Sequence, residues 1–85
     1  MRREPDYFGD QELILIFIGK KLREAKAVES LFTETGIDYL IEVDYYTAGI
    51  IFRGERAGAF FYVAPEQEDA AAAVLAKRRY RRVSQ

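Results

Sequence analysis

A run of six apolar residues at positions 13–18 constrains the fold of this chain more than any other feature. The run reads Leu-Ile-Leu-Ile-Phe-Ile, alternates nowhere with polar residues and is closed by Gly19. A strand that is apolar on both faces must be covered on both faces. The run therefore predicts a buried strand over residues 12–18, at the centre of a small sheet.

The length and composition of the chain favour one small globular domain. A chain of 85 residues buries about 60–65% of the surface that its unfolded form exposes, so its core is thin. No apolar run approaches the ~20 residues that span a bilayer, and the polar lead-in, residues 1–10, lacks the apolar core of a secretory signal. We expect a cytoplasmic protein without a membrane anchor, with one domain over residues 11–82 and a short tail at 83–85.

The absence of cysteine and histidine excludes most catalytic and metal-binding chemistry. There is no thiol nucleophile, and the commonest acid–base group near neutral pH is missing. Ser30 and Ser84 have no recognisable activating partner in the sequence. Glu42 and Asp44 lie two residues apart and could share a divalent cation, but two solvated carboxylates are the simpler interpretation. We expect a protein that is not an enzyme and has no cofactor and no metal site.

Three patterns predict the elements that follow the first strand. Apolar residues at three- and four-residue spacing predict a helix over residues 22–35 that lies on the sheet. Gly36 stands where a left-handed glycine ends a helix. Residues 37–46 alternate and predict a strand with one dry and one largely wet face. The apolar helix positions are Leu22, Ala25, Val28, Leu31 and Phe32, and the dry strand face carries Ile37, Tyr39, Ile41, Val43 and Tyr45.

The second half of the chain predicts an excursion, a strand and a helix. Residues 47–57 contain turn-forming glycines, and we treat them as an excursion from one hairpin, with a short strand at 50–53 left open and a second turn at 54–58. Residues 59–64 predict another strand, beside the first and ended by Pro65. The helix that follows has acids at its start and bases at 77–82, which we place in its last turns.

This order of elements is typical of the ferredoxin-like α+β fold. Two strands joined through a helix run parallel with a right-handed crossover, and the gap between them receives a later antiparallel strand. This split βαβ arrangement gives a mainly antiparallel sheet with two helices on one face. The other face is then left without a helix.

Two segments of the chain resemble a known family. Residues 25–37 (Ala-Lys-Ala-Val-Glu-Ser-Leu-Phe-Thr-Glu-Thr-Gly-Ile) and 61–70 (Phe-Tyr-Val-Ala-Pro-Glu-Gln-Glu-Asp-Ala) resemble the small prokaryotic signal-transducing protein domains, described as PII-like, ferredoxin-like modules. The resemblance spans residues 12–76. It implies the fold and, as an expectation, a regulatory role. Nucleotide binding, which PII proteins perform with long loops and basic residues, is not carried over.

A second resemblance predicts a different function. RNA-recognition motifs share this element order and stack bases on aromatic residues of the open sheet face. Residues 16–19 (Ile-Phe-Ile-Gly) are similar to their first-strand motif, and residues 56–60 (Arg-Ala-Gly-Ala-Phe) overlap their third-strand motif at its basic, small and aromatic positions. Ala57 replaces the second glycine of that motif and Gly58 its other stacking aromatic. Single-stranded RNA binding is therefore the alternative function.

Three groups of residues are candidate binding surfaces. The first could hold an anion beside a helix N-terminus, although scattered surface bases are the simpler interpretation: Lys20, Lys21, Arg53 and Arg56. The second could contact a polyanion, or could be a solvated helix end beside an acidic body: Lys77, Arg78, Arg79, Arg81 and Arg82. The third could form an interface or stacking face, or belong to the core: Phe17, Leu40, Tyr46, Phe60 and Tyr62.

Together these features predict a small non-catalytic regulatory or protein-interaction module. The helix-free face of the sheet carries an apolar patch large enough to need covering. We expect a homodimer, or a protein partner, to bury it. In the alternative, the face stays open to single-stranded RNA and the basic tail steers the RNA backbone.

Overall fold

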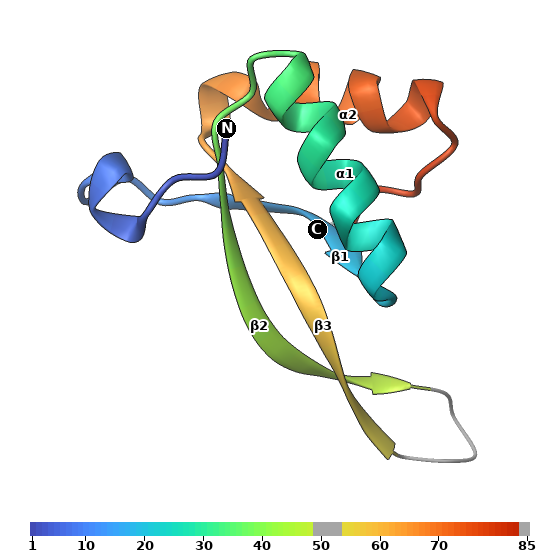
Figure 1. Ribbon diagram of the computed structural model, residues 1–85. Helices are drawn as coiled ribbons and strands as arrows, with labels where there is room; N and C mark the ends of the chain where they lie inside the picture. The colour runs from blue at the N-terminus through green and yellow to red at the C-terminus, as the bar shows by residue number, and fades with distance from the viewer. Residues whose placement is uncertain (49–53, 84–85) are drawn as a thin grey trace.

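The sheet of this protein has three strands, β1 (Ile14–Gly19), β2 (Tyr39–Ala48) and β3 (Gly54–Val63). In the computed structural model, which describes residues 1–48 and 54–83, the strand order is β1-β3-β2 (Figure 1). β3 runs antiparallel to both neighbours, so β1 and β2 are parallel to each other across it. The predicted ferredoxin-like split βαβ arrangement is confirmed.

β1 lies at an edge of the sheet, so the prediction that it is the central strand is wrong; β3 takes that position. β1 has a bulge between Leu15 and Phe17, and both Ile16 and Phe17 belong to the core. The outer edge of β1 also meets the end of the chain, where the Val83 N–H donates to the Ile16 carbonyl at 2.9 Å. The unbroken apolar run thus reflects a bulged and covered edge strand.

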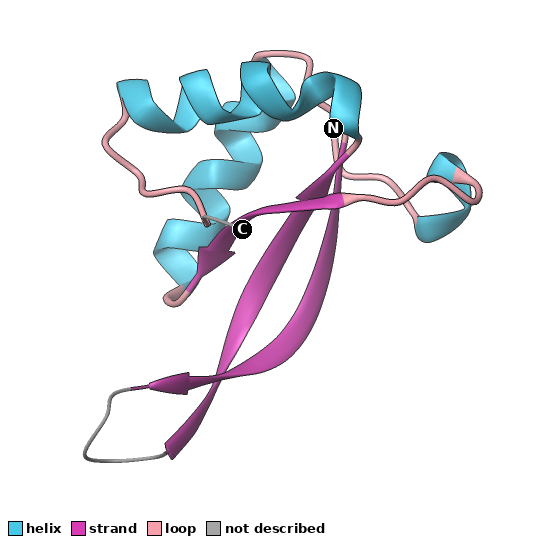
Figure 2. Ribbon diagram, turned by 180° about the vertical axis from the view of Figure 1, so that it is seen from behind, coloured by secondary structure: helices cyan, strands magenta, loops and turns pink. Residues whose placement is uncertain are grey.

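Two helices, α1 (Leu22–Glu34) and α2 (Glu68–Lys77), lie on the same side of the sheet, as predicted (Figures 1 and 2). α1 ends next to the predicted residue, because Thr35 is its C-cap and Gly36 takes a left-handed φ of 77°. β1 and α1 approach closely at Gly19, where a Cβ would lie 3.0 Å from that of Ala25. A short 3-10 turn, η2 (Pro65–Gln67), leads into α2.

The core lies between the helices and the sheet and is centred on Phe61 of β3. Phe61 is 0% exposed, and its ring packs with those of Phe17, Phe32 and Tyr39 at centroid distances of 5.8, 6.0 and 5.7 Å. Because the interior of α2 is mostly alanine, aromatic rings fill much of this space. The buried residues that the helices supply are Ala25, Val28, Phe32, Ala71 and Leu75.

The hairpin of β2 and β3 is longer than predicted and extends beyond the helices (Figure 1). Pairing continues as far as Ala48 opposite Gly54. The turn predicted at residues 54–58 is therefore wrong, because backbone pairing with β2 overrides the turn preference of the glycines there. Residues 49–53, including the short strand left open at 50–53, lie outside the described residues. We call residues 43–48 and 54–59 the distal hairpin.

The lead-in, residues 1–10, is folded against the sheet and is not frayed. Arg2 forms a parallel bridge with Tyr39, and the Arg3 N–H donates to the Tyr39 carbonyl at 2.7 Å. A 3-10 turn, η1 (Pro5–Phe8), follows these two arginines. Arg3 Nε and the Tyr7 hydroxyl donate to the Asp38 carboxylate at 2.9 and 3.1 Å. Burial raises the pKa of Asp38, but these two hydrogen bonds and the charge of Arg3 outweigh it and hold the pKa below its usual range.

The basic end of the chain lies beyond α2, so placing it in the last turns of a helix is wrong for all but Lys77. Arg79 has a left-handed φ of 62°, which ends the helix and turns the chain back. The Tyr80 N–H then donates to the Leu75 carbonyl at 3.0 Å. The Tyr80 ring packs edge-on against Phe17 at 5.5 Å. The C-terminal segment, residues 78–83, thus returns to β1.

Candidate functional site

The side of the sheet opposite the helices carries an apolar surface, which we call the open face. Strand register arranges it in rows across the sheet: Leu15, Tyr62 and Leu40 form one row. Leu13 precedes β1 and lines, with Leu40, Glu42 and Tyr62, a shallow hollow of about 250 Å³. The residues of the open face are Leu13, Leu15, Ile18, Leu40, Glu42, Phe60 and Tyr62.

Three of the five residues predicted for this face lie on it. Leu40 and Phe60 are only 8% and 9% exposed, and Tyr62 is half-buried. Phe17 is a correction: the bulge in β1 places it in the core, between the rings of Phe61 and Tyr80. Tyr46 pairs with Arg56 in the β2–β3 ladder, and its side chain lies outside the described part.

Charges of opposite sign lie near the two edges of the sheet, with acidic residues on β2 and lysines after β1. Glu42 stands directly opposite Phe60 in the ladder and Asp44 opposite Gly58, and both carboxylates are exposed. Burial raises the pKa of the Tyr62 hydroxyl, and the negative charges of Glu42 and Asp44 raise it further. On the other side, β1 ends at Gly19, whose row across the sheet contains Val43. Lys20 and Lys21 follow this row, and both line a groove that also includes Leu22 and Val43.

Two of the four bases predicted to bind an anion, Lys20 and Lys21, have described side chains. Lys20 and Lys21 are adjacent and exposed between β1 and α1, and the Lys20 N–H donates to the Glu24 carboxylate at 3.0 Å. Arg56 lies three residues along β3 from Ala59, the partner of Gly19, which is about 10 Å along the strand. Arg53 lies outside the described residues.

A second apolar surface is one that sequence periodicity misses. Leu22 and Val43 are 72% and 78% exposed, although the patterns assign both to buried faces. They flank a groove of about 230 Å³ that includes Gly19, Ala25 and residues 57–59. α1 begins at Leu22 while the hairpin continues past it, so the first helical turn and Val43 have no covering element. A periodic pattern does not show where the neighbouring element stops.

The five bases at the end of the chain do not share one surface. Arg82 is half-buried and donates to the Glu68 carboxylate at 2.9 Å, which ties the C-terminal segment to the start of α2. The exposed bases are Lys77, Arg78, Arg79 and Arg81.

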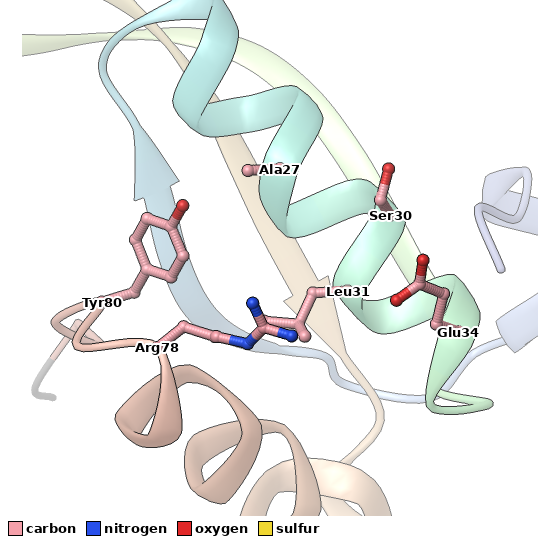
Figure 3. Close-up of a pocket in the computed structure, with 6 residues that line it drawn as sticks. All are labelled: Ala27, Ser30, Leu31, Glu34, Arg78 and Tyr80. Carbon is pink, nitrogen blue, oxygen red and sulfur yellow. The ribbon is translucent and has the colours of Figure 1, made fainter.

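A groove of about 440 Å³ lies between α1 and the C-terminal segment (Figure 3). Figure 3 shows the Arg78 guanidinium reaching toward Leu31, while Glu34 lies on the far side of that leucine. The reversal at Arg79 creates this groove by returning the chain toward α1. Arginine carries no sequence signal for a left-handed backbone, so the groove could not be read from the pattern. Its lining residues are Ala27, Ser30, Leu31, Glu34, Arg78 and Tyr80.

Neither a metal cluster nor a membrane helix is found within residues 1–48 and 54–83. No group of three or more carboxylates there is placed to hold a metal ion. No helix there is long and apolar enough to cross a membrane. No family model, curated protein or solved structure matches this chain. Its function is therefore inferred from the open face, the groove and the charges around them.

Proposed function

We propose that this protein is a small, non-catalytic, cytoplasmic regulatory module that acts through protein interaction, and that its open face packs against that of a second copy. The observation that supports this is the open face itself, because apolar residues line a sheet surface that neither helix covers. An apolar sheet face that no helix covers is a candidate interaction site. A regulatory role is what the resemblance of residues 25–37 and 61–70 to signal-transducing domains implies.

The charges beside the open face favour a second copy as the partner. In a two-fold arrangement whose axis runs parallel to β3, β1 of one copy lies over β2 of the other. The lysines after β1 of one copy are then level with Glu42 and Asp44 of the other. The reversed arrangement brings like charges together and is disfavoured. Charge at the rim therefore fixes the orientation, while apolar contact supplies the affinity.

The size of the open face indicates that the distal hairpin takes part in the contact. Three strands spaced by about 4.8 Å, each contributing six residues of about 3.3 Å, cover roughly 300 Å². A standard interface buries about 800 Å² on each partner. The backbone of the distal hairpin extends beyond the helices and lengthens the sheet (Figure 1). We therefore expect a dimer of moderate affinity.

Two observations weigh against the alternative of single-stranded RNA. A stacking platform needs exposed aromatic rings, but Phe60 is only 9% exposed. Glu42, directly opposite Phe60, repels a phosphate backbone. In fluorescence anisotropy with a mixed single-stranded RNA pool, we expect no binding that survives physiological salt. Micromolar binding that does survive, and is lost in Phe60→Ala, would favour RNA recognition.

The proposed dimer is tested by size-exclusion chromatography with light scattering at high micromolar concentration. We expect a mass twice the 9.8 kDa of the chain. Leu13→Asp places a charge in the hollow of the open face. This variant should have the mass of a monomer by light scattering and remain folded by circular dichroism. Leu22→Asp makes the same change at an exposed leucine on the helix side and should remain dimeric. A monomer of the unaltered protein would reject the proposal, as would a dimer that only Leu22→Asp disrupts.

A further inference from the structure

The groove between α1 and the C-terminal segment is built by an unusual backbone conformation. Arg79 is the only residue other than glycine with a positive φ within the described chain, and such conformations concentrate at functional sites. The Tyr80 N–H bond to Leu75 and the contact of its ring with Phe17 fix the tyrosine in place. Figure 3 shows its hydroxyl directed toward the part of α1 that carries Ala27. The segment thus holds the Tyr80 ring in a fixed place on the groove wall, while the Arg78 guanidinium reaches toward Leu31 (Figure 3).

The two sides of this groove carry opposite charges, Arg78 on one side and Glu34 on the other, which do not form an ion pair with each other. No ion pair joins Arg78 or Glu34 to another residue within residues 1–48 and 54–83. Glu34 is the last residue of α1, and the last turn of α1 contains no basic residue. The partial negative charge of a helix C-terminus adds to that of Glu34. The α1 side therefore attracts a cation, whereas Arg78 attracts an anion.

The space between these charges is apolar. Half-buried Leu31 lies between Arg78 and Glu34, Ala27 adds a methyl group, and the ring of Tyr80 forms the opposite wall (Figure 3). The Ser30 hydroxyl offers one further hydrogen bond. The volume of about 440 Å³ lies within the range of about 300–1,000 Å³ typical of small-molecule sites. A ligand that matches the groove has an anionic end, a cationic end and an apolar part.

We propose that this groove binds a free α-amino acid with an apolar side chain. Its carboxylate accepts hydrogen bonds from Arg78, its ammonium group faces Glu34, and its side chain packs between Leu31 and the ring of Tyr80. Glu34 disfavours ligands that are purely anionic, such as phosphate. The groove lies on the helix side of the sheet, so the site does not depend on dimerisation through the open face. Because Tyr80 also packs on Phe17, an occupied site stabilises the C-terminal segment against β1.

The test is a titration of the full chain with L-leucine, followed by two-dimensional 15N–1H NMR. We expect shifts centred on Leu31, Arg78 and Tyr80, with a dissociation constant below about 1 mM. Acetate and n-butylammonium each carry one of the two charges and should bind at least about tenfold more weakly, because each lacks one charge-assisted contact. Inorganic phosphate is the probe for a simple anion site.

Matched variants separate a built site from general surface charge. Arg78→Gln and Glu34→Gln, both at exposed positions, should each weaken leucine binding roughly tenfold. Arg81→Gln and Glu12→Gln remove exposed charges outside the groove and should leave it unchanged. Leu13→Asp should also bind leucine normally, whatever its oligomeric state. The proposal is overturned if leucine causes no shifts at 10 mM (about ten times the expected constant), if phosphate or acetate binds as well as leucine, or if the control variants weaken binding equally.

Discussion

The two faces of β3 bury their apolar residues in different ways. Phe61 and Val63 face the helices, and residues from α1 and α2 complete their burial. Phe60 and Tyr62, at alternate positions of the same strand, have only the neighbouring parts of the sheet beside them. One face is closed by other elements of the chain and the other is not. An apolar strand therefore does not require that other elements of the same chain cover both of its faces.

The largest effect that would test this comparison is the loss of Phe61. Phe61→Ala removes a ring at 0% exposure that contacts three other aromatic rings. Large-to-small changes of this kind reduce the free energy of unfolding by about 3–5 kcal/mol. Urea denaturation followed by circular dichroism measures the loss. A decrease no larger than that of Phe60→Ala would contradict the distinction between the two faces.

Phe60→Ala provides the matched change on the other face. We expect it to reduce the free energy of unfolding of the monomer by about 1–2 kcal/mol, because the open side lets neighbours and water fill the vacated space. The free energy of unfolding of the unaltered protein should also rise with protein concentration, because only folded chains form the proposed dimer. In Phe60→Ala this concentration dependence should disappear. If the concentration dependence persists unchanged, the dimer forms through a surface other than the open face.

Exchange of charges at the rim sharpens the comparison further. Asp44→Lys places a base level with the lysines of the second copy and should weaken dimerisation about two- to fivefold, as for exposed ion pairs. The double variant Asp44→Lys, Lys20→Asp should recover most of the lost dimer affinity. Sedimentation equilibrium at low and high salt measures both effects, which should shrink as salt screens the charges. No recovery in the double variant would argue against the proposed orientation.

The smallest expected effect concerns Asp38, which belongs to neither face. Its pKa lies below the ordinary 3.8 in the folded protein, so its contribution to stability is present at neutral pH and is lost as the pH falls through the folded pKa. For a partly exposed pair we expect less than about 1 kcal/mol. Urea denaturation at about pH 7 and about pH 3 should show that part of the acid-induced loss is absent in Asp38→Asn. Asp10→Asn, in the lead-in, is the control and should keep the full loss.

The architecture could be predicted because its signals are local. The spacing of apolar residues defines α1, Gly36 marks its end, and the alternation after residue 37 indicates β2. The order of these elements then restricts the topology to the split βαβ arrangement. The position of β1 could not be predicted, since an unbroken apolar run fits both a central strand and a bulged edge strand whose edge is covered.

The candidate sites were less predictable because they depend on contacts between distant parts of the chain. Alternation alone predicts Leu40 on the open face, whereas it does not assign Tyr62 to a face, and the bulge moves Phe17 to the opposite side. The exposure of Leu22 depends on where the hairpin runs relative to α1. The groove depends on a left-handed Arg79, a conformation that nothing in the neighbouring residues specifies.

The contacts of the lead-in and the C-terminal segment have a consequence for aggregation. The Arg3 N–H bonds to Tyr39 at one edge of the sheet, and the Val83 N–H bonds to Ile16 at the other. Uncovered edge strands pair with strands of other molecules, and an edge rich in β-branched apolar residues, such as β1, is especially prone to form fibrils. Removal of residues 78–83 would leave the aromatic rings around Phe61 in place and yet expose this edge. Each segment thus occupies one position at which a strand of another molecule could add to the sheet.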